Sequence, residues 1–130
     1  MDEYRVGNGN EQIKMAVDID TFGLAATRVF LVDLSTQVPG VPVGHSLDAT
    51  GDISKKDIGT PGKLVNKRLA AFTKIDLVGD DTFRKKESER LSGKLTLDGG
   101  SDGLKEFIFY KTVSDDFTTV LLDKKIDLTE

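Results

Sequence analysis

Apolar and polar residues alternate with a period of two along several stretches of the chain. In segment 12–20 the large apolar residues share one face: Ile13, Met15, Val17 and Ile19. Successive side chains of a β-strand point to opposite sides, so this alternation predicts a strand with one buried face, typical of an outer antiparallel strand. Segment 68–78 predicts another strand, with small or apolar residues on one face: Leu69, Ala71, Thr73, Ile75 and Leu77.

The segment 90–113 predicts a β-hairpin. Its first arm is apolar on one face, whereas its second arm, KEFIFYKTV (105–113), is apolar on both faces. A strand of the second kind is usually central in a sheet or lies between two layers. Segment 24–34, LAATRVFLVDL, predicts a second central strand for the same reason. The hairpin joint, DGGSDG (98–103), holds three glycines, which supply the positive φ angles of a tight reversal.

The first ten residues and the middle of the chain are less regular. Residues 4–6 predict a short edge strand within a loose lead-in over residues 1–10. Segment 37–61 holds all three prolines, and we expect an irregular stretch there. Within it, three valines predict a short extended piece at an edge: Val38, Val41 and Val43. Thr60 and Pro61 predict a helical turn over about residues 61–67.

Two later segments are also ambiguous. The charged run TFRKKESER (82–90) fits a solvated helix, with Lys85 and Glu89 one turn apart, or an extended approach to the next strand. Residues 117–128 predict a last strand that is interrupted near 123–125 by a bulge or a short turn.

Together these segments amount to about six or seven strands, with at most a short helical turn. Parallel β-α-β units would need long amphipathic helices between the strands, and the sequence offers none. We therefore predict an all-β fold, an antiparallel β-sandwich of two sheets, with a small β-barrel as the alternative. A chain of 130 residues is expected to form a single domain, residues 1–130.

The composition narrows the classes of function. There is no cysteine, which excludes disulfides and thiolate metal sites. The net charge of −4 comes from interspersed lysines and acids, so we expect no nucleic-acid binding. No apolar run approaches the ~18 residues of a membrane-spanning helix, so we expect no membrane insertion. The compartment stays open, and an extracytoplasmic location is slightly favoured if a signal peptide has been removed.

His45, in VGHSLD, is the only histidine of the chain. A histidine can act as a general base or as a metal ligand, and Ser46 follows it directly. A serine nucleophile also needs an orienting acid, and the GxSxG pattern is absent. A surface loop histidine is the simpler interpretation. A hydrolase with a loop-built site of carboxylates or His45 stays open as an alternative.

The sequence SLDATGDISKKD (46–57) resembles the calcium loop of EF-hand proteins. That loop offers oxygens at positions 1, 3, 5, 7, 9 and 12 and a glycine at position 6. The resemblance implies four calcium ligands at positions 3, 5, 7 and 12: Asp48, Thr50, Asp52 and Asp57. Position 1 departs from the pattern, since it is Ser46, and position 12 is aspartate instead of the usual glutamate. An ordinary polar turn is the alternative, and the hairpin joint offers a second set of oxygens from Asp98, Ser101 and Asp102.

A second partial resemblance runs through VPGVPV (38–43) and LDATGDIS (47–54). Together these stretches are similar to the carboxypeptidase regulatory-like β-sandwich repeat, with its GVxV strand and later DAxG turn. The resemblance covers a short part of the chain, and we carry no function over from it.

These observations favour a non-catalytic β-sandwich module that binds or assembles. It would belong to a surface or extracytoplasmic protein, or would be a subunit that pairs through a strand edge. The expected partner is another protein or a second copy. No cofactor is expected, and calcium is the one candidate ligand. The alternatives are a calcium-dependent module that uses the loop at 46–57 and the hydrolase built around His45 or loop carboxylates.

Overall fold

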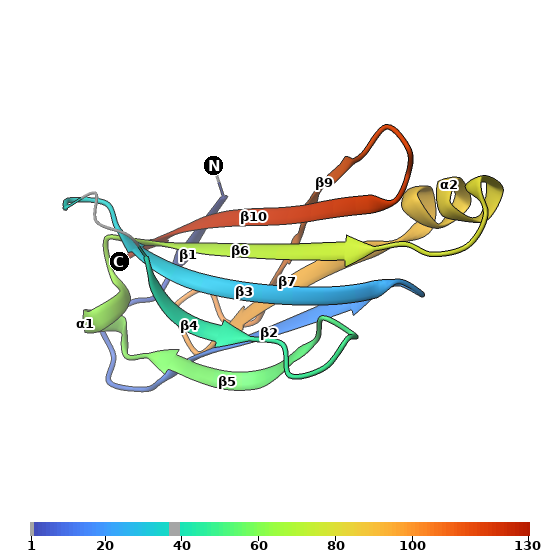
Figure 1. Cartoon of the computed structure of the whole chain (residues 1–130). Helices are drawn as coiled ribbons and strands as arrows, with labels where there is room; N and C mark the ends of the chain where they lie inside the picture. The colour runs from blue at the N-terminus through green and yellow to red at the C-terminus, as the bar shows by residue number, and fades with distance from the viewer. Residues whose placement is uncertain (1, 37–39) are drawn as a thin grey trace.

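The computed structural model describes residues 2–36 and 40–130, which form two β-sheets and two helices (Figure 1). The strands are β1 (Asp2–Arg5), β2 (Ile13–Asp20), β3 (Leu24–Asp33), β4 (Val41–His45), β5 (Ile53–Gly59), β6 (Lys67–Asp76), β7 (Ser92–Asp98), β8 (Lys105–Ile108), β9 (Tyr110–Val113) and β10 (Thr119–Thr129). The helices are α1 (Pro61–Leu64) and α2 (Asp81–Arg90). The predicted all-β sandwich is confirmed, with ten strands among the described residues instead of six or seven.

One sheet has six strands and the other has four. The six-stranded sheet has the order β1-β10-β6-β3-β4, and β9 also pairs with β10. The four-stranded sheet has the order β5-β2-β7-β8. Every pair is antiparallel except β1 with β10, which is parallel. β2 lies between β5 and β7, so the prediction that it is an outer strand is wrong. β3 lies between β6 and β4 and is an interior strand, as expected.

The core lies between the two sheets and consists of the inward faces that the alternation predicted. Met15 and Leu95 of the four-stranded sheet are fully buried, as are Leu69 and Ile75 of the six-stranded sheet. Burying a side chain of this size contributes roughly 1.5–3 kcal/mol each. All five residues predicted to share the inner face of segment 68–78 are buried there, which confirms β6 and its orientation.

The last strand is continuous, so the predicted break near 123–125 is wrong. β10 pairs with β6 in one unbroken register from Thr119 to Asp127. The polar residues lie where the other side of β10 changes partner. Asp123 pairs with Tyr110 of β9, whereas Ile126 pairs with Asp2 of β1. Residues 123–125 are polar and lie where β9 ends and β1 begins as the neighbour of β10. One of them, Lys124, forms an ion pair with Asp2.

The irregular segment 37–61 contains two strands that both lie at edges. β4 pairs only with β3 and includes Pro42, in agreement with an extended piece at an edge, although Val38 lies outside the described residues. β5 was not predicted. Its sequence, ISKKDIG, lacks an apolar alternation because most of its residues are exposed at an edge.

The two helices lie near opposite ends of the sandwich (Figure 1). α1 confirms the helical turn that begins after Thr60. α2 is a helix of ten residues, so the expectation of at most a short helical turn is wrong. It begins at the Asp80 cap, whose carboxylate accepts a hydrogen bond from the Phe83 N–H at 2.8 Å. At the other end Lys111 donates to three carbonyls, those of Ser88, Glu89 and Leu91. The helix has no apolar stripe, and it is stabilised instead by the Asp80 cap and by the hydrogen bonds from Lys111 of β9.

The beginning of the chain is not a loose lead-in over residues 2–6. Tyr4 is fully buried, and its hydroxyl donates to the Gly103 carbonyl at 2.6 Å and accepts from the Gly100 N–H at 2.9 Å. Arg5 pairs with Asp102 through its backbone N–H and its guanidinium. A Cβ on Gly100 would lie 2.6 Å from the Arg5 carbonyl oxygen, so glycine permits this close approach. The hairpin joint therefore fastens β1 to the fold.

Candidate functional site

The second arm of the predicted hairpin crosses from one sheet to the other. Its first half, β8, pairs with β7 at the edge of the four-stranded sheet, which confirms the hairpin. Its second half, β9, pairs with β10 in the six-stranded sheet. Phe109 lies at the crossing and is buried, like Phe107 before it. Of the two alternatives predicted for this arm, the central strand is wrong, because both of its halves lie at edges. The arm instead passes from one layer of the sandwich to the other.

The backbone of β8 is open on the side away from β7. The Phe109 N–H donates to the Gly93 carbonyl at 3.0 Å, and the β7–β8 register runs unbroken beside this pair. In an antiparallel pair, hydrogen-bonded residues alternate with residues whose backbone groups point away. Counting back from Phe109, Glu106 and Ile108 direct their N–H and C=O groups outward. β8 is the last strand of its sheet, so no strand within the described residues takes up these groups.

Large apolar side chains accompany this open backbone. Leu104 is 66 % exposed, Ile108 is 63 % exposed and Tyr110 is 69 % exposed. The rest of this outer sheet face is largely polar, as at Asp18 and Ser92, which are also exposed. We refer to residues 104–110 as the β8 edge. It combines the outward backbone groups of Glu106 and Ile108 with three exposed apolar side chains: Leu104 just before β8, Ile108 within it, and Tyr110 after the chain has crossed to the other sheet. An exposed edge strand of this kind can pair with another strand.

The charged side chains of the β8 edge have partners within the chain. The Lys105 ammonium donates to the Glu3 carbonyl at 3.1 Å and lies 5.4 Å from the centre of the Phe107 ring. The Glu106 carboxylate lies 3.4 Å from the Lys94 ammonium of β7. Lys105 is therefore directed towards β1, and Glu106 towards the neighbouring strand, so neither charge is left alone at the edge.

The predicted calcium ligands are divided between two places. Asp48, Thr50 and Asp52 line a hollow of about 570 Å³ beside β4 and β5, with His45 at its rim. Asp57 does not line it; it lies on β5, 3.8 Å from the Lys14 ammonium. The three residues in the hollow take part in local hydrogen bonds.

Hydrogen bonds within the chain occupy the two aspartates of this hollow. Asp48 accepts from Thr50, and these hydrogen bonds lower the pKa of its carboxyl. Asp52 accepts from the Ile19 N–H at 2.8 Å. In residues 2–36 and 40–130, no three His, Cys, Asp or Glu side chains are grouped so that they could hold a metal ion. The calcium site at 46–57 stays a prediction.

The residues of the hairpin joint have other partners. Asp98 pairs with Lys55 of β5 at 3.2 Å, and this contact lowers the pKa of its carboxyl. Asp102 pairs with Arg5, whose backbone N–H lowers the pKa of that carboxyl. These carboxylates thus connect the joint to β5 and to β1.

His45 and Ser46 are not paired with each other in the part of the chain that the structure describes. Ser46 accepts a hydrogen bond from the Thr27 N–H at 2.9 Å, which ties the end of β4 to β3. His45 is exposed on the edge strand β4. The hydrolase alternative stays a prediction, and the described contacts assign His45 no catalytic partner.

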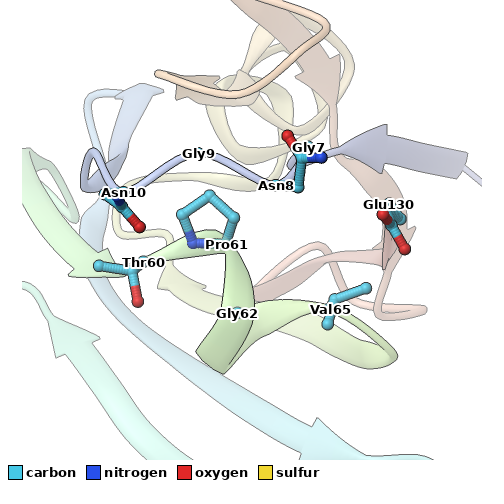
Figure 2. A pocket seen from close by; sticks show the side chains of 9 residues that line it. All are labelled: Gly7, Asn8, Gly9, Asn10, Thr60, Pro61, Gly62, Val65 and Glu130. Carbon is cyan, nitrogen blue, oxygen red and sulfur yellow. The ribbon is translucent and has the colours of Figure 1, made fainter.

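A further hollow, of about 410 Å³, lies at the α1 end of the sandwich between the loop at 7–10 and the helix. Pro61 lies in its middle, with Asn10 and Glu130 on opposite sides (Figure 2). Its polar groups are spread around the rim and do not converge on one point, which a specific small-molecule site would require.

No protein-family model, curated protein or solved structure matches this chain. The partial resemblances in segment 38–57 therefore receive no support from a match of greater length. Among the described residues, neither helix is long and apolar enough to cross a membrane.

Proposed function

We propose that this chain is a non-catalytic β-sandwich module that binds a protein partner by strand addition at the β8 edge. The observation that carries the proposal is the coincidence of outward backbone groups at Glu106 and Ile108 with the exposed apolar side chains of Ile108 itself and of Leu104 just before the strand. An added strand would form main-chain hydrogen bonds with the backbone groups of Glu106 and Ile108, and its own side chains would cover the exposed apolar side chains beside them.

The sequence of the second arm supports this interpretation. Its pattern is that of a central strand, with apolar residues on both faces, yet it lies at an edge. The inward residues Phe107 and Phe109 are buried by the chain itself. The outward residue Ile108 is exposed. A partner strand would bury it, as residues of a strand with two apolar faces usually are.

Selection from a phage-displayed library of random extended peptides tests the proposal. The wild-type chain is compared with Ile108→Lys and with a control, Ser54→Lys, which adds the same charge to the exposed strand β5 at the other edge of the same sheet. We expect wild type and Ser54→Lys to enrich the same peptides, and Ile108→Lys to lose them. Equal enrichment by all three chains, with folding verified by circular dichroism, would contradict the proposal.

A further inference from the structure

We propose that a hollow on the outer face of the six-stranded sheet binds a small aromatic anion. The hollow has a volume of about 460 Å³, which is within the usual range of small-molecule sites. Side chains from three neighbouring strands line it: Phe30, Val32, Arg68, Ala70, Phe72 and Lys125. We call it the Ala70 hollow. It lies on the other sheet from β8, so the proposal does not depend on strand addition at the β8 edge.

The strand register places a small residue at the centre of this face. Phe30 of β3 and Lys125 of β10 both lie opposite Ala70 of β6, one on each side. Arg68 and Phe72 lie two residues from Ala70 along β6 and therefore share its face. Four long side chains thus surround an alanine. Ala70 is only 5 % exposed, although it is not part of the core cluster between the sheets, so its longer neighbours form the walls of a hollow above it.

The walls suit an aromatic ring. The rings of Phe30 and Phe72 have their centroids 6.3 Å apart, and their planes are inclined by 57°. Phe72 is 44 % exposed, so part of its ring is open to a ligand. Gly40 packs behind Phe30, since a Cβ on Gly40 would lie 3.0 Å from the Phe30 Cβ. A ring above Ala70 would contact both phenylalanines in the offset or edge-to-face arrangements that aromatic groups favour.

The charges of the lining select an anion. Both charged side chains that line the Ala70 hollow are basic, Arg68 and Lys125. The Asp127 carboxylate accepts hydrogen bonds from Arg68 at 2.7 and 3.4 Å, so this guanidinium already has a partner. Lys125 is exposed and forms no ion pair with any residue that the structure describes. Its ammonium is therefore available to the anionic group of a ligand.

A neighbouring hollow has lining charges of the same sign. It has a volume of about 400 Å³ and adjoins the Ala70 hollow at Phe30. Its charged or titratable residues are Arg28 and His45, which lie opposite each other on β3 and β4. Within residues 2–36 and 40–130, no Asp or Glu lines either hollow, and Asp123, opposite Phe72, lies outside both. This face therefore offers basic groups on both sides of Phe30 in a chain of net charge −4.

Three small molecules separate the ring from the charge. 2-Naphthoate has fused rings and a carboxylate, 2-naphthamide keeps the rings without the charge, and acetate keeps the carboxylate without the rings. NMR titration of the backbone amides locates each molecule and gives its Kd. We expect 2-naphthoate to bind with a Kd of about 1 mM and to shift the amides around Ala70. 2-Naphthamide should bind about threefold more weakly, because an exposed ion pair is lost, and acetate should not bind.

Variants assign the two parts of the site. Ala70→Leu fills the hollow and should abolish binding of 2-naphthoate. Lys125→Gln removes the charge and should weaken binding of 2-naphthoate about threefold, while binding of 2-naphthamide stays unchanged. Lys74→Gln is the matched control, because Lys74 lies on the same face of β6, is exposed and lies outside the hollow. It should bind 2-naphthoate like the wild type.

No shift of the amides around Ala70 at several millimolar 2-naphthoate would overturn the site. Full binding by Ala70→Leu would show that the ligand lies elsewhere and would overturn it as well. Equal affinity for 2-naphthoate and 2-naphthamide, or equal effects of Lys125→Gln and Lys74→Gln, would overturn the preference for an anion. The peptide selection described above is independent of all these outcomes, because it tests the other sheet.

Discussion

The two edges of the four-stranded sheet are built in opposite ways. β5, at one edge, is rich in exposed charged residues, and its pairing with β2 contains two irregularities. Lys55 pairs with Asp98 at 3.2 Å, and Asp57 lies 3.8 Å from Lys14. β8, at the other edge, pairs with β7 in a regular register and exposes Ile108.

Lysines and irregular pairing are the usual means by which a sheet edge is protected from other strands. Both features are present at β5. β8 also has two exposed charged residues, but Lys105 is directed towards the Glu3 carbonyl and Glu106 towards Lys94 of β7, and the pairing of β8 with β7 is regular. The difference indicates that exposure of the β8 edge is not a general property of this fold. One edge of the sheet is charged and irregularly paired, whereas the other is regularly paired and exposes Ile108.

The largest expected effect separates the two faces of β8. Phe107→Ala should lower the free energy of unfolding by about 3–4 kcal/mol, because Phe107 is 5 % exposed and fills the core. Ile108→Ala should cost about 0.5 kcal/mol or less in dilute solution, since its side chain is 63 % exposed. Denaturant unfolding at low protein concentration measures both. Similar losses for the two variants would show that Ile108 is covered within the chain.

The second effect concerns the stability that Glu87 of α2 contributes. Glu87 is buried, and burial alone would raise its pKa. Hydrogen bonds from Arg90, the Phe22 N–H and Thr21, together with the Arg90 charge, outweigh burial and lower the pKa below the ordinary 4.5. Arg90 also contacts Asp20, at 3.2 Å, and so connects α2 to the end of β2.

A lowered pKa in the folded state means that Glu87 contributes stability above pH 4.5 and loses it as the pH falls through the folded value. Glu87→Gln should remove about 2 kcal/mol at neutral pH, because the charged acceptor is lost. It should also flatten the acid limb of the stability curve measured by denaturant unfolding at several pH values. An unchanged acid limb would show that the loss of stability at low pH comes from the protonation of other carboxylates.

The third effect tests whether the β5 edge can be made as prone to pairing as the β8 edge. Lys55→Ile with Lys56→Ile, made in the Ile108→Lys background, removes both lysines of β5 and leaves the β8 edge blocked. Self-association should increase by about tenfold or more, because apolar edges pair and aggregate. Light scattering over a concentration series measures this. A variant as monomeric as its Ile108→Lys parent would show that the two lysines are not what protects β5, and that its irregular pairing with β2 or Asp57 does so.

The smallest effect is expected for calcium. Asp57 lies apart from Asp48, Thr50 and Asp52, so millimolar calcium should change the melting temperature by less than about 1 °C relative to chelator. Thermal melts with calcium and with chelator measure the difference. A rise of several degrees that Asp48→Asn abolishes would instead establish the loop at 46–57 as a calcium site.

The sequence predicts the interior of this fold better than its edges. The faces of β2 and β6 follow from alternation, because both strands cover the core and have neighbours on each side. β5 was missed because a charged edge strand has no apolar period. α2 could not be assigned because only Glu87 and Ser88 are buried in it, and distant partners such as Lys111 hold it.

The candidate site was visible in the sequence only as an unusual pattern. KEFIFYKTV has apolar residues on both faces, and this pattern predicted a central strand. The arm instead lies at the edges of two sheets. The crossing between sheets at Phe109 has no glycine or proline to mark it, so the edge position could not be foreseen. The calcium prediction relied on spacing within 46–57, but β5 begins at Ile53 and carries Asp57 away from the loop.

Amide hydrogen exchange resolved by NMR tests most directly whether the β8 edge is open and takes up a strand. In dilute solution, the Glu106 and Ile108 amides should exchange rapidly, whereas those of Lys105 and Phe107, bonded to β7, should be protected. Adding a selected peptide should slow exchange at Glu106 and Ile108. Protection of these two amides in a dilute monomer, or rapid exchange with every selected peptide, would contradict the account.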